Sequence, residues 1–214
     1  AGNLASKNVQ TNQTLSSVAG LALDTSTNGG ISSNYNAIST TGSSVSVTPK
    51  SATVSATATA LTYNASTQHQ QAETTSGFIT GDLISVTGQA SGKNAGTYAS
   101  NLALSGADLG NYSVIVNNAN LVIDKANLSL SGTRVYDAST TFAGQHLIAT
   151  GVAGETFTVT GNGDASNLAS KNVQTAQALS SVTGLTLGTS ANGGLSDNYN
   201  ALSTAASSVS VAAK

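Results

Sequence analysis

Three residue types are absent from this chain of 214 residues: cysteine, methionine and tryptophan. Without cysteine, the chain has no disulfide, thiol nucleophile or thiolate metal site. Charged residues make up only 7% of the sequence, against about a quarter in an ordinary soluble domain. A net charge of −2 without a basic cluster argues against nucleic-acid binding. No apolar run approaches the roughly 18 residues that indicate a membrane span.

Small polar residues fill the space that these absences leave. Serine, threonine, asparagine and glycine together account for nearly half of the chain, and aromatic residues for only 4%. The mean hydropathy is close to zero, at +0.03, and valine, leucine, isoleucine and threonine are frequent. That content of apolar and β-branched residues argues against disorder. The composition therefore predicts a secreted, β-rich and repetitive protein.

The sequence repeats itself at an offset of 164 residues. Residues 1–50 and 165–214 align without gaps and are identical at 36 of 50 positions. A weaker similarity relates 50–124 to 125–214, because each segment has a tyrosine-containing turn, then a Lys-Asn pair and finally an Asn-Tyr pair. We predict a structural role for these recurring motif residues. They are Tyr63, Lys93, Asn94, Asn111 and Tyr112 in the first segment, and Tyr136, Asp137, Lys171, Asn172, Asn198 and Tyr199 in the second.

Apolar residues alternate with polar ones in short runs, which is the pattern of half-buried β-strands. The clearest run, Thr53–Leu61, is predicted to be one strand with Val54 on its apolar face, and Thr97–Leu104 is a further β-rich run. Glycine- and asparagine-rich turns separate such runs at roughly ten-residue spacing. No segment has convincing helical periodicity. The prediction is an all-β chain of small β-sandwich (Ig-like) modules arranged end to end, which would bury what each module alone leaves exposed.

The tyrosines allow two interpretations. Their recurrence at module positions favours rings that fill the module cores, with each hydroxyl reaching a backbone carbonyl near the surface. The alternative is a carbohydrate-binding β-sandwich module in which exposed tyrosine and asparagine side chains grip glycans.

Two sets of motifs resemble known bacterial repeats. Val135–Thr141 resembles the Tyr-Asp-Gly signature of the YDG repeat, with Ala138 where that family usually has glycine. The motifs Thr62–Thr67, Gly92–Tyr98 and Leu104–Tyr112 are similar to the MBG domain, a bacterial immunoglobulin-like module. The resemblance divides the chain into three parts. They are the C-terminal part of a YDG-like module at 1–49, an MBG-like module at 50–124 and a complete YDG-like module at 125–214.

The resemblance implies a function as well as a fold. Such tandem repeats are typical of large secreted adhesins and biofilm-matrix proteins of Gram-negative bacteria, similar to filamentous haemagglutinin and often exported by two-partner secretion. The expected role is a stalk or fibre segment at the cell surface, whose partners are neighbouring modules of the same chain. Receptors, whether host or matrix glycans or proteins, would be bound by regions outside this segment. Poorly guarded strand edges leave lateral self-association into filaments open.

Chemistry beyond this structural role finds little support. His69 and His146 lie in polar segments away from any nucleophile or metal-ligand spacing, and the nine carboxylates are dispersed. Gly161–Asp164 resembles a fragment of a calcium-binding turn but occurs once, so a plain turn is favoured. A Lys–Asn isopeptide bond from a lysine that opens a module remains open, beside solvated or carbonyl-bound lysines. We therefore expect no enzyme activity, no catalytic or metal site and no cofactor.

Overall fold

The computed structural model describes residues 2–214, and its regular elements are β-strands and single 3₁₀ turns. The all-β prediction is confirmed, and the arrangement into several small sheets is consistent with sandwich-like modules. Within the described residues, no helix has the length and apolar character needed to cross a lipid bilayer.

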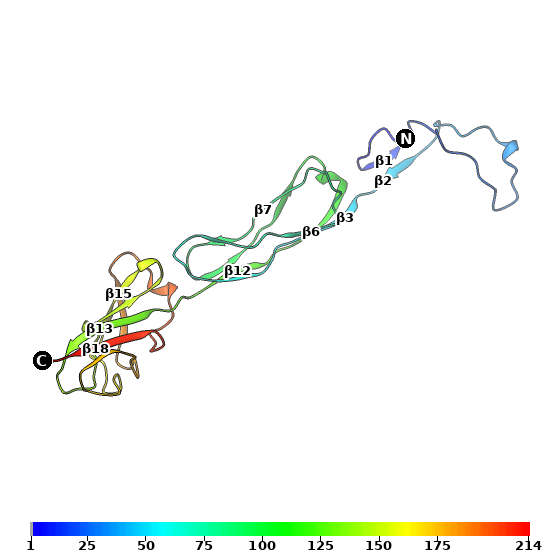
Figure 1. The fold of residues 1–214 in the computed structure, drawn as a ribbon. Coiled ribbons are helices and arrows are strands. Elements are labelled where there is room, and N and C mark those ends of the chain that lie inside the picture. Colours follow the sequence, from blue (N-terminus) through cyan, green and yellow to red (C-terminus); the bar gives the residue numbers. More distant parts are fainter. Residues whose placement is uncertain (1) are drawn as a thin grey trace. The chain divides into compact units, whose positions relative to one another are not determined.

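The chain folds into two compact units (Figure 1). The predicted segment 50–124 contributes to both units, and residues 1–49 and 125–214 lie in different units. The division into three modules is a statement about sequence repeats, and it stays a prediction. Unit 1 comprises Ala1–Ser55, Glu73–Gly88 and Leu102–Asn117, and unit 2 comprises Ala56–Ala72, Gln89–Asn101 and Asn118–Lys214.

Unit 1 contains three small sheets. In the largest, the order is β11-β3-β6, with β11 parallel to β3 and β6 antiparallel to it. Its buried apolar side chains include Ala52, Val54 and Tyr112. The elements of unit 1 are β1 (Gln10–Gln13), η1 (Ser32–Asn34), β2 (Val45–Val47), β3 (Lys50–Ser55), β6 (Thr74–Ser76), β7 (Ser85–Thr87), β10 (Ala103–Ser105), η2 (Leu109–Asn111) and β11 (Tyr112–Asn117).

Unit 2 is organised around a six-stranded sheet of order β16-β18-β13-β14-β15-β17. The last strand, β18, lies beside β13 in parallel register, which Figure 1 shows in red and green. The elements of unit 2 are β4 (Thr59–Thr62), β5 (Gln68–His69), β8 (Ser91–Gly92), β9 (Gly96–Ala99), β12 (Asn120–Asp124), β13 (Ser129–Val135), η3 (Gly144–His146), β14 (Leu147–Thr150), η4 (Val152–Gly154), β15 (Thr156–Thr160), β16 (Gln174–Gln177), β17 (Thr186–Ser190), η5 (Ser196–Asn198) and β18 (Ser207–Ala212).

The hydrophobic core of unit 2 is larger and better covered than that of unit 1. It continues from Leu121 and Ile123 on β12 to Leu130 on β13, and to Phe142 and Phe157, all fully buried. The core therefore joins residues of the predicted 50–124 segment to those of the 125–214 segment.

Two strand predictions were wrong in the same way. The run Thr53–Leu61 is broken at residues 56–58, and the buried side chains shift from Val54 to the odd-numbered Thr59. The reason is that β3 pairs with β11 whereas β4 pairs with β12 in another sheet, and changing partners ends the alternation. Thr97–Leu104 likewise splits into β9, which pairs with β12, and β10, which pairs with β7.

Candidate functional site at the joints between modules

The motif residues singled out from the sequence meet at two joints. At each joint, the Asn-Tyr pair of one segment contacts the Lys-Asn pair of the segment before it in the chain. One joint lies wholly within unit 1 and the other wholly within unit 2, so each can be described from the contacts of a single unit.

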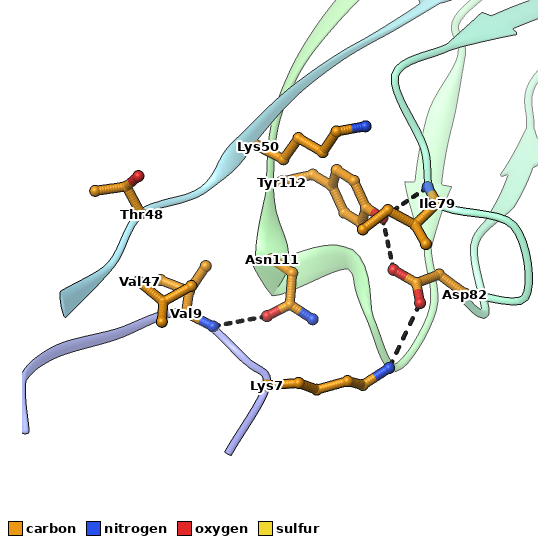
Figure 2. Close-up of a pocket in the computed structure, with 9 residues that line it drawn as sticks. All are labelled: Lys7, Val9, Val47, Thr48, Lys50, Ile79, Asp82, Asn111 and Tyr112. Atoms are coloured by element: carbon orange, nitrogen blue, oxygen red, sulfur yellow. Dashed lines mark hydrogen bonds and ion pairs between the residues drawn. The ribbon is translucent and has the colours of Figure 1, made fainter. Parts of the chain in front are cut away.

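In unit 1, the side-chain amide of Asn111 binds a backbone loop near the start of the chain. The N–H of Val9 donates to Asn111 Oδ1 at 2.9 Å, and Asn111 Nδ2 donates to Asn8 Oδ1 at 3.2 Å. The 3₁₀ turn η2 places the amide there, because it ends at Asn111 directly before β11. One side chain therefore closes the contact through its acceptor and its donor at once (Figure 2).

The next residue, Tyr112, fixes a carboxylate beside the same joint. Its hydroxyl accepts a hydrogen bond from the Ile79 N–H at 2.9 Å and donates to Asp82 Oδ2 at 2.5 Å. The ring packs edge-on against Phe78, with centroids 4.9 Å apart. The hydrogen bond to Asp82, followed by burial, raises the pKa of the Tyr112 phenol. The phenol therefore stays protonated and donates to the carboxylate across the neutral pH range.

A lysine completes the unit 1 joint. Lys7 Nζ lies 3.5 Å from Asp82 Oδ1 and 3.6 Å from Asp108 Oδ1. The charges of Asp108 and Asp82 raise the pKa of Lys7. Because the lysine side chain is largely exposed, this pairing contributes charge complementarity more than stability. A cavity of about 210 Å³ between Lys7, Val9, Val47, Lys50, Ile79, Asp82, Asn111 and Tyr112 lies at the joint (Figure 2).

Unit 2 repeats the amide contact with different residues. The N–H of Ala95 donates to Asn198 Oδ1 at 2.8 Å, and Asn198 Nδ2 donates to Asn94 Oδ1 at 3.2 Å. Asn198 ends the 3₁₀ turn η5, as Asn111 ends η2 in unit 1. Its side chain is fully buried, at 1% exposure. Water therefore cannot readily replace these hydrogen bonds if the amide is removed.

The tyrosine contact is also repeated and is more elaborate in unit 2. The Tyr199 hydroxyl accepts from the Val152 N–H at 3.0 Å and donates to Glu155 Oε2 at 2.7 Å. The second oxygen of Glu155 accepts from the Tyr63 hydroxyl at 2.8 Å. The two rings meet edge to face with centroids 5.5 Å apart, and Phe157 packs on Tyr199 at 5.2 Å. A single carboxylate therefore bridges tyrosines from two predicted modules.

The tyrosine environment accounts for its titration. Burial first, and then the hydrogen bond to Glu155, raise the pKa of both Tyr63 and Tyr199 above the usual phenol value. Close packing leaves no room for a side chain at Gly151, where a Cβ atom would lie 2.2 Å from the Tyr199 hydroxyl oxygen. The ring is therefore fixed in place by backbone as well as by its hydroxyl.

The chemistry of both joints is that of an adhesive contact. Each carboxylate accepts from a phenol that stays protonated, and each asparagine amide has both an acceptor and a donor in use. No group of three or more histidine, aspartate or glutamate side chains suited to a metal ion occurs within residues 2–214. The geometry favours holding successive segments together over turning over a substrate.

The remaining motif residues lie elsewhere. Tyr136 packs half-buried against the unit 2 core. Asp137 pairs with the buried guanidinium of Arg134 and accepts from the Ser139 N–H at 3.0 Å, and the latter bond is the first cause of its lowered pKa. The side chains of Lys93, Lys171 and Asn172 are exposed.

The interpretation of the tyrosines needs one correction. Tyr63, Tyr112 and Tyr199 are buried as core rings, but their hydroxyls donate to carboxylates and not to backbone carbonyls. Only Tyr98, among the described residues, shows the expected bond, at 2.9 Å to the Asn94 carbonyl. Carboxylates are the stronger acceptors, and folding brings them in from distant sequence positions.

Sequence reasoning missed the partners of the motif residues, namely Asp82, Glu155 and Asn8. The two acids looked isolated because they lie 30 and 44 residues from the tyrosines they bind. One local signal does distinguish them, since each acid comes three residues after the N–H that the same hydroxyl accepts. Asn8 belongs to the copied segment 1–50, so its Lys-Asn pair could have been grouped with the other two.

The other candidates behave as surface features. His69 and His146 are exposed. Asp164 accepts from the Ser166 N–H at 2.8 Å, a bond that lowers the pKa of Asp164, so Gly161–Asp164 forms an ordinary turn in this structure.

Comparison with known families finds one domain, and it coincides with part of unit 2. A YDG domain is found at residues 117–207, which span β12, β13 and the rest of the large sheet up to the first residue of β18. Neither the curated proteins nor the solved structures give a match. The chain therefore contains a YDG domain at residues 117–207.

Proposed function

We propose that this chain is a structural repeat segment, a stalk or fibre, of a large extracellular bacterial adhesin or biofilm-matrix protein. It extends the chain from the cell, and its partners are neighbouring modules. Receptor binding belongs to regions outside the segment, and exposed strand edges leave lateral pairing into filaments as an additional contact.

One observation carries this proposal: the same set of contacts is built twice, from different residues. Both joints use an Asn-Tyr pair, a Lys-Asn pair and an acid three residues after a backbone donor. A contact that recurs along a repetitive chain fits a protein whose task is to link modules in a defined manner. The YDG domain at residues 117–207 supports the same class of repeat protein.

The carbohydrate-binding alternative loses its main residues. Stacking on a sugar needs an exposed ring, but Tyr63, Tyr112 and Tyr199 are buried with their hydroxyls in use. Tyr35 is the exposed tyrosine of the described chain, at 68% exposure. A glycan array probed with the chain and with Tyr35→Ala tests this alternative, and binding that the substitution abolishes would support it.

The proposal is tested by locating the protein on intact cells of its source. Antibodies against residues 125–214 should label material outside the cell envelope, and external protease should remove that label without lysis. An internal cytoplasmic protein serves as the control for cell integrity. Label confined to the cell interior, or label that is released only by lysis, contradicts an extracellular stalk.

A further inference from the structure

A third Lys-Asn pair, Lys171-Asn172, is followed by an exposed valine. Val173 is 57% exposed, whereas Val9, its counterpart in the first copy, is half-buried against Asn111. No residue within 2–214 accepts a hydrogen bond from the Val173 N–H. The third copy of the motif therefore presents, uncovered, the groups that the first two copies use.

The uncovered loop already has the conformation of the covered one. The Asn172 N–H donates to Ser170 Oγ at 3.1 Å, as the Asn8 N–H does to Ser6 Oγ at 3.1 Å.

The following glutamine is fixed in the same way in both copies. Gln174 Nε2 donates to the Ser170 carbonyl at 3.3 Å, and Gln10 Nε2 to the Ser6 carbonyl at 3.4 Å. Because the loop is preformed, docking a partner there requires little reorganisation.

We infer that Lys171, Asn172 and Val173 form a docking surface for the Asn-Tyr turn of a further module of the 50–124 type. This inference rests on the proposed function and adds the partner and its contacts. The partner's asparagine Oδ1 accepts from the Val173 N–H, and its Nδ2 donates to Asn172 Oδ1. The partner's carboxylates face Lys171.

Charge complementarity selects this type of module over the other. The lysine of the first copy, Lys7, lies between two acids of the 50–124 segment, Asp82 and Asp108. In the unit 2 joint the carboxylate is instead held by a tyrosine, and Lys93 makes no ion pair within the described chain. Lys171 shares its local sequence with Lys7, so its fitting partner carries the pair of acids.

The test measures amide hydrogen exchange at the three equivalent N–H groups of Val9, Ala95 and Val173. In the chain as it stands, we expect protection at Val9 and Ala95 and near-free exchange at Val173. A second protein carries a copy of residues 51–124 appended after Lys214, which reproduces the link from Lys50 to Ser51. In this extended chain we expect Val173 to exchange at least about tenfold more slowly.

Two variants of the extended chain are matched controls. Replacing the appended copy of Asn111 by alanine, or Asn172→Ala on the docking surface, should return Val173 to fast exchange. Asn172→Ala in the unextended chain should change neither Val9 nor Ala95.

Each outcome decides a separate point. A folded appended module that leaves Val173 unprotected overturns the docking surface but leaves the proposed function standing. An appended module that fails to fold also overturns it, because residues 1–50 support the same sequence in unit 1. Free exchange at Val9 and Ala95 would instead contradict the joints themselves and remove the support for the proposed function.

Discussion

The chain contains a controlled comparison, because residues 2–50 and 166–214 are near-copies that fold in different surroundings. Their backbones agree in detail. Asn12 and Ala176 both adopt left-handed backbone, with φ of 53° and 52°. The pairing of β1 with β2 has the same irregular register as that of β16 with β18. Local backbone structure therefore follows from the local sequence in both copies.

Burial separates the two copies. Leu4 is 38% exposed and its counterpart Leu168 only 4%, while Tyr35 and Tyr199 are 68% and 3% exposed. The second copy is covered by β13, β14 and β15, which continue its sheet. Residues 186–190 form β17 beside β15, whereas the equivalent residues 22–26 form no strand. The comparison shows that the copied sequence specifies its turns alone but needs neighbouring strands for its core.

The largest expected effect is a core truncation that should affect one copy only. Leu168→Ala removes a side chain buried in the unit 2 core, so we expect a loss of about 3 kcal/mol in unfolding free energy. Leu4→Ala, at the matched exposed position, should cost less than about 1 kcal/mol. Urea unfolding followed by circular dichroism measures both. Equal losses would mean that the two copies are covered alike in solution.

The buried joint amide gives the next effect. Asn198→Ala leaves the Ala95 N–H without an acceptor in a buried place, so a loss of about 2 kcal/mol is expected. Asn34 is the exposed counterpart in the first copy, and Asn34→Ala should change stability by less than about 0.5 kcal/mol. Exchange at the Ala95 amide gives a local readout. An unchanged Ala95 exchange rate in the Asn198→Ala protein would show that this amide does not close the joint.

The strands and the motif residues could be predicted from the sequence, but their pairing could not. Alternation located β15 and β18 well, because each keeps one partner sheet along its length. It failed across residues 56–58, where the chain changes sheets while the alternating pattern continues.

The same limit applies to the joints. Repetition identified Asn198 and Tyr199, but Glu155 carries no repeat signal of its own and becomes a partner only through folding. Ala138 illustrates a third case. It stands where the YDG signature usually has glycine, and its φ of 63° explains that preference.

Alkaline titration should distinguish the two tyrosine environments. The pKa of Tyr199 is raised in the folded state, chiefly by burial and then by Glu155. The folded protein therefore holds this proton more tightly than the unfolded chain. The resulting stability is fully present below the unfolded phenol pKa of about 10 and is lost as the pH rises above it. Unfolding free energies measured from pH 8 to 11 should fall at the alkaline end.

Matched substitutions assign that fall to a tyrosine. Tyr199→Phe should reduce the steepness of the decline, and Tyr63→Phe should do so as well because its pKa is also raised. Tyr35→Phe, at the exposed counterpart, should leave the profile unchanged. A decline that is equally steep in Tyr199→Phe and in the parent chain would assign the alkaline loss to other groups.

The smallest effect concerns the one position where the copies share a strained backbone but differ in residue type. Left-handed backbone is unfavourable for alanine and better tolerated by asparagine, so Ala176 carries more strain than Asn12. Ala176→Gly should therefore stabilise unit 2 by about 0.5 kcal/mol, after the entropy that glycine adds to the unfolded chain. Asn12→Gly should be nearly neutral. Thermal unfolding of both proteins tests this, and a lower melting temperature for Ala176→Gly would show that the Ala176 methyl group stabilises the fold by more than its backbone strain costs.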